Sequence, residues 1–234
     1  MEGFTSSRPS FLELIVSIDL DKPAQVYVID DDNEVRRSLH ALLSTANMLS
    51  WPFSSADDFL DSLATLEPAP ILLDVRMPMV DGIQLLTMLR QRGVEWPVIM
   101  MTAHGDIQVA VQSIKLGAIE FLEKPFEFEA LDRALQMAFG QLAAINAAIS
   151  ARNAARRRLA SLSAREREVL DVLAQGIPNK IAAHTLSLSV RTIEMHRARA
   201  LAKLDVKSMV EVVRLASLVA QSPPKSDQDN DLTI

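Results

Sequence analysis

The sequence predicts an α/β domain built on a doubly wound, five-stranded parallel sheet, followed by a smaller all-α domain. Strand-like runs alternate with helix-period stretches in residues 24–140, and only helical patterns follow. Charge also divides the chain. Residues 1–151 hold 10 Lys and Arg against 21 Asp and Glu, whereas residues 152–221 hold 13 against 6. These opposite signs suggest a cation as partner for the first part and a polyanion for the second.

Composition narrows the class of protein further. The chain has 234 residues and no Cys, so it can bury two cores but cannot use a disulfide, a thiolate zinc site or a cysteine nucleophile. We find no apolar stretch of bilayer-spanning length, and residues 11–20 lack the basic lead-in of a signal peptide. We therefore expect a cytoplasmic protein without membrane contact. Residues 1–23 are expected to be a disordered extension, and the alternative is an extra element packing on the first domain.

The first domain shows five strand-and-helix units. Its strands are expected at Gln25–Asp30, Met48–Phe53, Ile71–Asp74, Pro97–Thr102 and Ile119–Leu122. Its helices are expected at Glu34–Thr45, Ala56–Ala64, Ile83–Arg92, Ile107–Leu116 and from Glu127 onward. Pro52 cannot donate a ladder hydrogen bond and belongs near an edge or a strand end. In such a sheet, ligands bind at the carboxyl ends of the strands.

Polar residues close these strands. Three consecutive acids follow the first strand in QVYVIDDDN, residues 25–33, where they would repel one another and raise their pKa values. Asp74, Thr102 and Lys124 follow three other strands, so all converge on one edge. Mg²⁺ prefers oxygen ligands and keeps several waters. The crowded acids therefore predict a magnesium site beside a phosphoryl group, with Asp32 or Asn33 serving as a helix cap.

Four segments of the first domain resemble the receiver domain of bacterial two-component response regulators, and most closely its FixJ-like branch. They are VYVIDDDNEVRRSL, ILLDVRMPMVDG, VIMMTAHGD and GAIEFLEKPF, in this order. The resemblance implies a receiver domain over residues 24–140 with the flavodoxin-like strand order 2-1-3-4-5. It also implies a cis peptide bond between Lys124 and Pro125.

The same resemblance implies roles for individual residues. The metal ligands would be Asp30, Asp31, Asp74 and the backbone carbonyl of Arg76. Asp74 would accept the phosphoryl group, Thr102 would bond a phosphoryl oxygen, and Lys124 would pair with the phosphate. Phe121 matches the family's switch aromatic, although an aromatic near a strand end can equally be a core residue.

An apolar repeat continues beyond the receiver. It consists of Leu131, Leu135, Ala138, Leu142, Ile145 and Ile149, which alternate four and three residues apart. This pattern suits a dimerising stalk or a helix that packs on its own domain. Residues 141–160 are expected to form a helical linker.

Residues 161–221 are similar to a LuxR-type helix-turn-helix DNA-binding domain. The motifs are REREVL, GIPNK and SVRTIEMHR. Ser163 and Glu166 form a predicted capping box, a short helix begins at Asn179, and a basic helix begins at Val190. A last helix over Val206–Ala220 can form a dimer interface in this family, and residues 222–234 are expected to be disordered.

The resemblance places the basic helix in the major groove of DNA. The residues expected to face DNA are Arg191, Thr192, Glu194, Met195, Arg197 and Arg199. Asn179 and Lys180 would open the supporting helix beside a phosphate. Glu194 could accept a hydrogen bond from cytosine or orient a neighbouring arginine. The expected core residues of this helix are Ile193, Leu201 and Leu204.

Three positions depart from the family patterns. Ser187 stands where Gly usually provides a left-handed backbone, so strain is expected there. Ala182 replaces a larger apolar residue, and Met79 replaces the Gly that usually follows Met-Pro.

The sequence thus predicts a transcription regulator controlled by phosphorylation and not an enzyme. A sensor histidine kinase would phosphorylate Asp74, and the resulting dimer would bind promoter DNA and act with RNA polymerase, most simply as an activator. One alternative is a haloacid-dehalogenase-type phosphatase, because Asp30-x-Asp32 after an apolar strand also suits that chemistry. Another is a DNA-binding protein whose receiver is vestigial.

Overall fold

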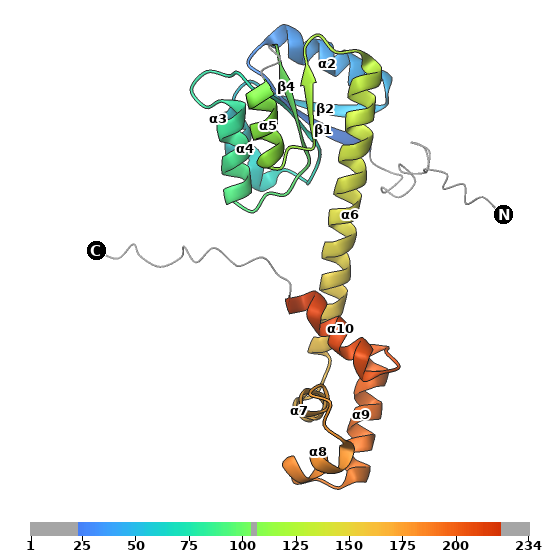
Figure 1. Cartoon of the computed structure of the whole chain (residues 1–234). Helices are drawn as coiled ribbons and strands as arrows, with labels where there is room; N and C mark the ends of the chain where they lie inside the picture. Colours follow the sequence, from blue (N-terminus) through green and yellow to red (C-terminus); the bar gives the residue numbers. More distant parts are fainter. Residues whose placement is uncertain (1–22, 104–106, 221–234) are drawn as a thin grey trace, which may run out of the picture. The chain divides into compact units, whose positions relative to one another are not determined.

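The computed structural model describes residues 23–103 and 107–220 of the chain (Figure 1). The predicted extension up to residue 22 and the predicted tail, residues 222–234, lie outside the described residues. The chain divides between residues 146 and 147 into two compact units. Each unit has its own core and is described separately.

The first unit contains the predicted five-stranded parallel sheet, in the order β2-β1-β3-β4-β5. The strands are β1 (Ala24–Ile29), β2 (Met48–Phe53), β3 (Ile71–Asp74), β4 (Val98–Thr102) and β5 (Glu120–Glu123). The strand order confirms the predicted fold class. It also confirms that Pro52 lies on an edge strand, where its missing N–H group costs no pairing with a central neighbour.

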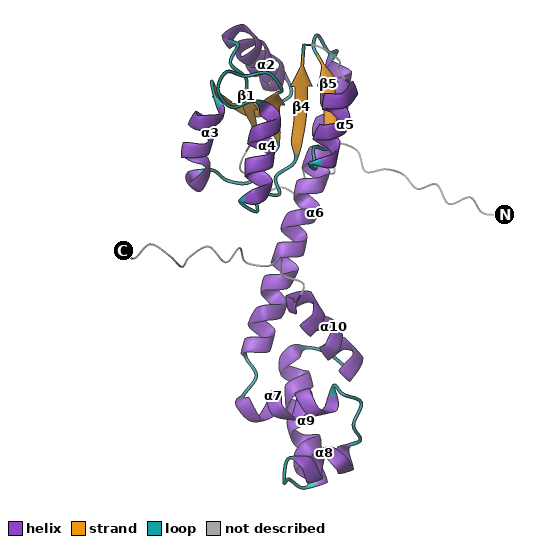
Figure 2. Ribbon diagram, turned by 60° about the vertical axis from the view of Figure 1, so that its left-hand side comes forward, coloured by secondary structure: helices purple, strands orange, loops and turns teal. Residues whose placement is uncertain are grey.

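Helices cover both faces of this sheet (Figure 2). They are α2 (Asn33–Thr45), α3 (Ala56–Ser62), α4 (Gly82–Gln91), α5 (Ile107–Lys115) and α6 (Phe128–Ala160), with a short 3₁₀ turn, η1 (Leu63–Thr65), after α3. Helices α2 and α6 bury Leu39 and Leu135 against one face. Helices α3 and α4 bury Phe59 and Leu86 against the other face, where residues of α5 also pack. The loop after β3 contributes Val75 and Met77 to the core on the second face, and the polar ends of the strands lie beside it.

Side-chain caps fix where the helices begin. The Asp32 carboxylate accepts a hydrogen bond from the Glu34 amide at 2.8 Å, which confirms Asp32 as the N-cap of α2. Asp81 and Gln84 form a reciprocal capping box at the start of α4. These caps hold two helix N-termini close to the strand ends that carry the acids.

Helix α6 is 33 residues long and continues through the predicted linker. Its apolar repeat is buried as far as Leu142, whereas Ile149 is 48% exposed. By length and composition α6 could cross a membrane, so the expectation that no stretch is long enough was wrong for this helix. Its first turns pack in the receiver core and its last turns carry Arg156, Arg157 and Arg158, so α6 is not apolar along its whole length.

In its described residues, up to residue 220, the second unit contains helices and no strands, and it has a small two-part core. Its helices are α7 (Ala164–Leu173), α8 (Asn179–Thr185), α9 (Val190–Leu204) and α10 (Met209–Ala220). The predicted capping box at Ser163 and Glu166 is present. The last helix begins at Met209 and not at Val206 as predicted, because Asp205 ends α9 with a left-handed backbone at φ 53°.

Two of the three unusual positions adopt the backbone that the family reserves for glycine. Ser187 follows α8 with φ 53°, and Met79 precedes α4 with φ 67° while its side chain is 93% exposed. A Cβ atom in this region is strained. Ala182 is fully buried in the core between α7, α8 and α9.

Replacing Ser187 with glycine should therefore stabilise the second unit. We expect Ser187→Gly to raise its free energy of unfolding by up to about 1 kcal/mol. Urea unfolding followed by NMR signals of α8 and α9 would measure this change. Ser187→Ala keeps the Cβ atom and is the matched control, so an equal gain in both variants would contradict the strain argument.

Candidate functional site

The carboxyl ends of β1, β3 and β5 bring two acids and one lysine together. Lys124 Nζ lies 2.5 Å from Asp30 Oδ2 and 2.5 Å from Asp74 Oδ1. Asp30 is 1% exposed and Asp74 is 6% exposed. A single ammonium group thus serves two buried carboxylates, and these three side chains carry a net charge of about −1 when Asp30 and Asp74 are ionised.

The second oxygen of each carboxylate is bonded by the backbone. Asp30 Oδ1 accepts the Asp32 amide at 2.9 Å, and Asp74 Oδ2 accepts the Arg76 amide at 2.7 Å. Burial raises the pKa of Asp74 above its ordinary value, although the hydrogen bond from Lys124 opposes this effect. Burial would lower the pKa of Lys124, but its hydrogen bonds to both carboxylates outweigh burial and raise it. Lys124 therefore remains a cation at neutral pH.

Other predicted site residues surround this cluster. Thr102 is buried at the end of β4, and its carbonyl oxygen accepts the Lys124 amide at 2.6 Å. The Lys124–Pro125 peptide is cis, as predicted. Phe121 is half-buried and packs against the core formed with α3, α4 and α5. Asp31 is exposed beside the buried Asp30.

The predicted ligands fit Mg²⁺ only with help from other oxygen atoms. Among the described residues, no three acidic or histidine side chains are grouped closely enough to hold a metal ion. Asp30 and Asp74 supply two buried carboxylates with uncompensated charge, and Asp31 lies next to Asp30 in the chain. Several waters and one backbone carbonyl could complete an octahedron of oxygen atoms around the ion. The predicted carbonyl is that of Arg76.

Two residues that the sequence did not single out support this site. Arg36, on the second turn of α2, donates to the Asp30 carbonyl oxygen at 2.6 Å. Gly82 begins α4 against β3, where a Cβ atom would lie 2.1 Å from the Asp74 carbonyl oxygen. Two features of the sequence could have pointed to these residues: an arginine six residues after Asp30 and a glycine directly after Asp81. Neither feature is specific for a site of this kind.

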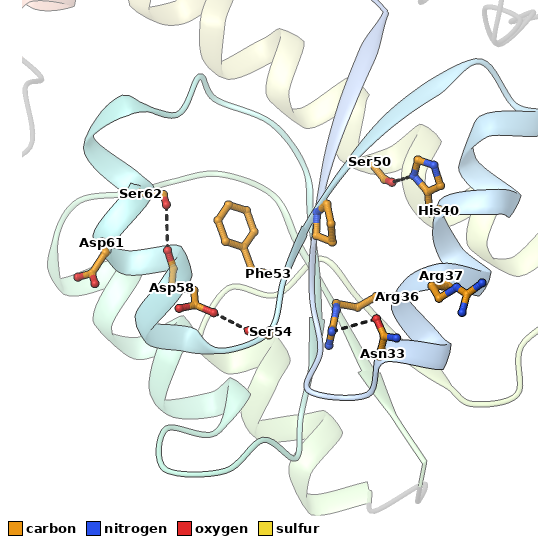
Figure 3. A pocket seen from close by; sticks show the side chains of 11 residues that line it. Asn33, Arg36, Arg37, His40, Ser50, Phe53, Ser54, Asp58, Asp61 and Ser62 are labelled. Carbon is orange, nitrogen blue, oxygen red and sulfur yellow. Dashed lines mark hydrogen bonds between the residues drawn. The ribbon is translucent and has the colours of Figure 1, made fainter.

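A separate polar groove of about 810 Å³ lies at the β2 edge of the sheet. Figure 3 shows α2 residues Arg37 and His40 on one side and α3 residues Asp58 and Asp61 on the other. His40 Nδ1 lies 2.7 Å from Ser50 Oγ. This groove does not contain Asp30, Asp74 or Lys124, although Arg36 both lines it and bonds Asp30.

In the second unit, α9 has a core face and an exposed face. Ile193, Ala200 and Leu204 are fully buried, and Leu201 is half-buried against the same core. The exposed predicted DNA contacts are Arg191, Glu194, Met195 and Arg199. Spacings of three and four residues place these side chains along one side of α9.

The remaining predicted DNA contacts are less uniform. Thr192 is half-buried, and its amide donates to the N-cap Ser189 at 3.1 Å. Arg197 is half-buried, and its Nε atom has no hydrogen-bond partner within the described parts of the chain. At the start of α8, Lys180 is exposed and Asn179 is half-buried.

A buried acid anchors α9 to α7. Glu166 Oε2 accepts the Lys203 ammonium at 2.7 Å and the Ser163 amide at 2.8 Å. The hydrogen bond from Lys203, followed by the bond from the Ser163 backbone, lowers the pKa of Glu166 to about 2. The capping residue of α7 thereby also fixes the far end of α9.

Comparison with known proteins supports both units. A family model for the response regulator receiver domain matches residues 26–136, and a model for bacterial regulatory proteins of the luxR family matches residues 160–216. The transcriptional regulatory protein FixJ of Azorhizobium caulinodans is 42% identical over 198 residues, or 85% of this chain and 94% of that protein. FixJ of Bradyrhizobium diazoefficiens is 44% identical over 193 residues, or 82% and 93%.

Two solved structures are similar over most of the chain. The response regulator StyR has a TM-score of 0.73 and 35% identity, covering 84% of this chain and 99% of that one. Full-length FixJ from B. japonicum has a TM-score of 0.53 and 40% identity, covering 86% and 98%. The fold and the converging acids define a response regulator. The chain belongs to the FixJ-like family, in which a receiver domain and a LuxR-type DNA-binding domain form a phosphorylation-dependent regulator of transcription.

The shared ammonium predicts an asymmetry between two substitutions. Asp74→Asn removes a buried charge and leaves the Asp30–Lys124 pair balanced, so the free energy of unfolding at neutral pH should fall by less than about 1 kcal/mol or rise. Lys124→Met leaves two buried carboxylates together and should cost about 3 kcal/mol. Urea unfolding followed by tryptophan fluorescence measures both. A larger loss in Asp74→Asn than in Lys124→Met would contradict this account.

Glu166 predicts an acid-sensitive second unit. Because its pKa in the folded protein lies below the ordinary 4.5, its stabilisation is complete above pH 4.5 and is lost as pH falls toward about 2. Glu166→Gln should flatten this pH dependence. Urea unfolding at several pH values, followed by NMR signals of α7 and α9, measures it. Glu168→Gln, which alters the exposed pair with Arg165, is the control and should keep the wild-type dependence.

Proposed function

We propose that Asp74 accepts a phosphoryl group from a sensor histidine kinase while Mg²⁺ is bound beside it, and that this modification controls binding to promoter DNA. The observation that carries the proposal is the pairing of Lys124 with both Asp30 and Asp74 at the carboxyl edge of the sheet. That pairing places a nucleophile, a cation and a second acid in one site, as phosphoryl transfer requires.

The transfer assigns each residue a part. A carboxylate oxygen of Asp74 attacks the phosphorus of the kinase's phosphohistidine, the phosphorus–nitrogen bond breaks, and the imidazole leaves. The Lys124 ammonium stabilises negative charge on the phosphoryl oxygens, because it stays protonated in the folded protein. The hydroxyl group of Thr102, which is buried at the end of β4, would then donate a hydrogen bond to a phosphoryl oxygen.

A divalent cation would complete the site. Asp30, Asp31, Asp74 and the Arg76 carbonyl would hold it together with water. When bound, Mg²⁺ neutralises charge on the phosphoryl oxygens. The excess negative charge of the Asp30, Asp74 and Lys124 cluster favours this cation over an anion.

The output follows from the charge added at Asp74. An acyl phosphate adds negative charge next to Thr102 and competes with Asp30 for Lys124, which would rearrange the β4 and β5 loops around Phe121. The modified receiver would dimerise in the cytoplasm, and paired α9 helices would enter successive major grooves of promoter DNA. Contact with RNA polymerase would then activate transcription.

The phosphatase alternative has less support. It requires Asp30 as the nucleophile and Asp32 as a second catalytic acid; the bonding of Asp30 does not separate it from Asp74, since each carboxylate is buried and is bonded by a backbone amide and by Lys124. Asp32 would be its acid and base, but Asp32 caps α2. The alternative of a vestigial receiver also has less support. The acids and the lysine of the receiver motif are all present, namely Asp30, Asp31, Asp74 and Lys124.

Labelling by a small phosphodonor tests the acceptor. The chain should incorporate acid-stable, alkali-labile phosphate with Mg²⁺ but not with EDTA, and Asp74→Asn should abolish this labelling. Asp30→Asn should slow labelling by about 100-fold, because it weakens the metal site but keeps the nucleophile. Retained labelling in Asp74→Asn together with loss in Asp30→Asn would favour the phosphatase.

Equal promoter affinity with and without phosphodonor would favour the vestigial receiver.

Substitutions on the second unit test its DNA surface. Lys180→Ala should weaken binding to all DNA sequences. It should also reduce the slope of log affinity against log salt concentration by about 1, because one phosphate contact is lost. Glu194→Gln should instead change the preferred base at one position. Fluorescence anisotropy at several salt concentrations measures both effects. Lys207→Ala, which removes a cation between α9 and α10, is the control for net charge. An equal effect of Lys180→Ala and Lys207→Ala would argue against a specific phosphate contact.

A further inference from the structure

Strand β2 presents an apolar patch on the edge of the receiver sheet. β2 pairs only with β1 among the described strands. Leu49 is 41% exposed and Trp51 is 45% exposed, and both line a groove of about 330 Å³ together with Tyr27 and Leu66. Two large apolar side chains at an open sheet edge form a surface on which another segment can pair or pack.

The backbone of β2 is open only along its first half. The Asp30 amide donates to the Phe53 carbonyl at 3.2 Å, so the Phe53 backbone faces β1. Because backbone direction alternates along a strand, the backbone groups of Met48, Ser50 and Pro52 face the open edge. Pro52 has no N–H group. An added strand can therefore form a ladder only near Met48 and Ser50, beside the apolar patch.

The second half of the same edge is polar. It lies in the larger groove of Figure 3, between Arg37 and His40 of α2 and Asp58 and Asp61 of α3. Apolar side chains would desolvate these charged groups without compensation. Both the backbone and the chemistry of the edge thus confine an apolar partner to the patch at Leu49 and Trp51.

The chain carries a segment with matching properties directly before β1. In FLELIVSIDL, residues 11–20, every even position is apolar: Leu12, Leu14, Val16, Ile18 and Leu20. Three of the five odd positions are polar, namely Glu13, Ser17 and Asp19, and the other two are Phe11 and Ile15. A period of two is the pattern of a strand with one buried face. Two residues, Asp21 and Lys22, separate this segment from Pro23, which lines the groove with Leu49 and Trp51.

The connection is long enough for such docking. β1 and β2 are parallel, with Ala24 beside Met48, so a segment that lies outside β2 and then enters β1 must run antiparallel to β2. Crossing from outside β2 to β1 spans two strand spacings, or about 10 Å. The four residue steps from Leu20 to Ala24 can reach about 13 Å. Residues 21–23, Asp-Lys-Pro, have the composition of a turn.

We propose that residues 11–20 dock antiparallel on the open edge of β2 in the same chain, with their even-numbered side chains over Leu49 and Trp51. The docked segment covers an edge that would otherwise be available for pairing between molecules. This inference concerns the receiver alone and does not depend on phosphoryl transfer at Asp74.

Trp51 reports on the docking directly. The chain has two tryptophans, so Trp96→Phe leaves Trp51 as the only one in an otherwise full-length protein. In this background, Val16→Asp with Ile18→Asp should raise acrylamide quenching of Trp51 by about twofold and shift its emission to the red, because the apolar face no longer binds. The matched control, Ile15→Asp with Ser17→Asp, adds the same charge to the opposite face and should leave both signals unchanged.

Amide hydrogen exchange distinguishes strand pairing from simple covering. The Met48 and Ser50 amides should be protected in the full chain and lose protection in Val16→Asp with Ile18→Asp, while circular dichroism shows that the receiver remains folded. Equal quenching in all three proteins, or an equal increase in both double variants, would overturn the proposal. Trp51 shielding that disappears on dilution would also overturn it, because docking would then occur between two copies.

Discussion

The ammonium of Lys124 pairs with two carboxylates that come from different strands of the sheet, and both carboxylates are buried. Burying two like charges around one cation is unfavourable unless backbone groups also bind them. The surrounding loops meet this requirement, since the Asp32 and Arg76 amides bind the remaining carboxylate oxygens. The cluster remains negative overall, which is the charge that the proposed binding of a divalent cation requires.

The elements that meet at this edge are placed by ordinary local rules. The three acids after β1 have separate tasks: Asp30 is buried in the cluster, Asp31 is exposed, and Asp32 caps α2. Gly82 lets α4 begin against the Asp74 backbone. In the second unit, the Glu166 carboxylate both caps α7 and binds Lys203 on α9, so one acid links the start of α7 to the end of α9.

The sequence predicted the strands and helices of the first unit well, because burial on both faces gives the central strands continuous apolar runs that end in polar residues. The order of the strands was implied by the resemblance to receiver domains. Asp30, Asp74, Thr102 and Lys124 could be placed at one edge from topology alone. The sharing of Lys124 and the part of Arg36 could not, because they depend on side-chain geometry across distant segments. The start of α10 was misplaced because the capping spacing of Ser208 and Glu211 was overlooked; Ser208 Oγ accepts the Glu211 amide at 3.3 Å.

The proposed function requires Lys124 to exchange Asp30 for the phosphoryl group as a partner. A crystal structure of the full chain with Mg²⁺ and beryllium trifluoride, a mimic of the phosphoryl group, would test this exchange directly. We predict beryllium bonded to Asp74, with Lys124 Nζ bound to a fluorine atom and the Thr102 hydroxyl bound to another. Beryllium trifluoride absent from Asp74, or bound there while Lys124 still bridges Asp30 and Asp74 unchanged, would contradict the account.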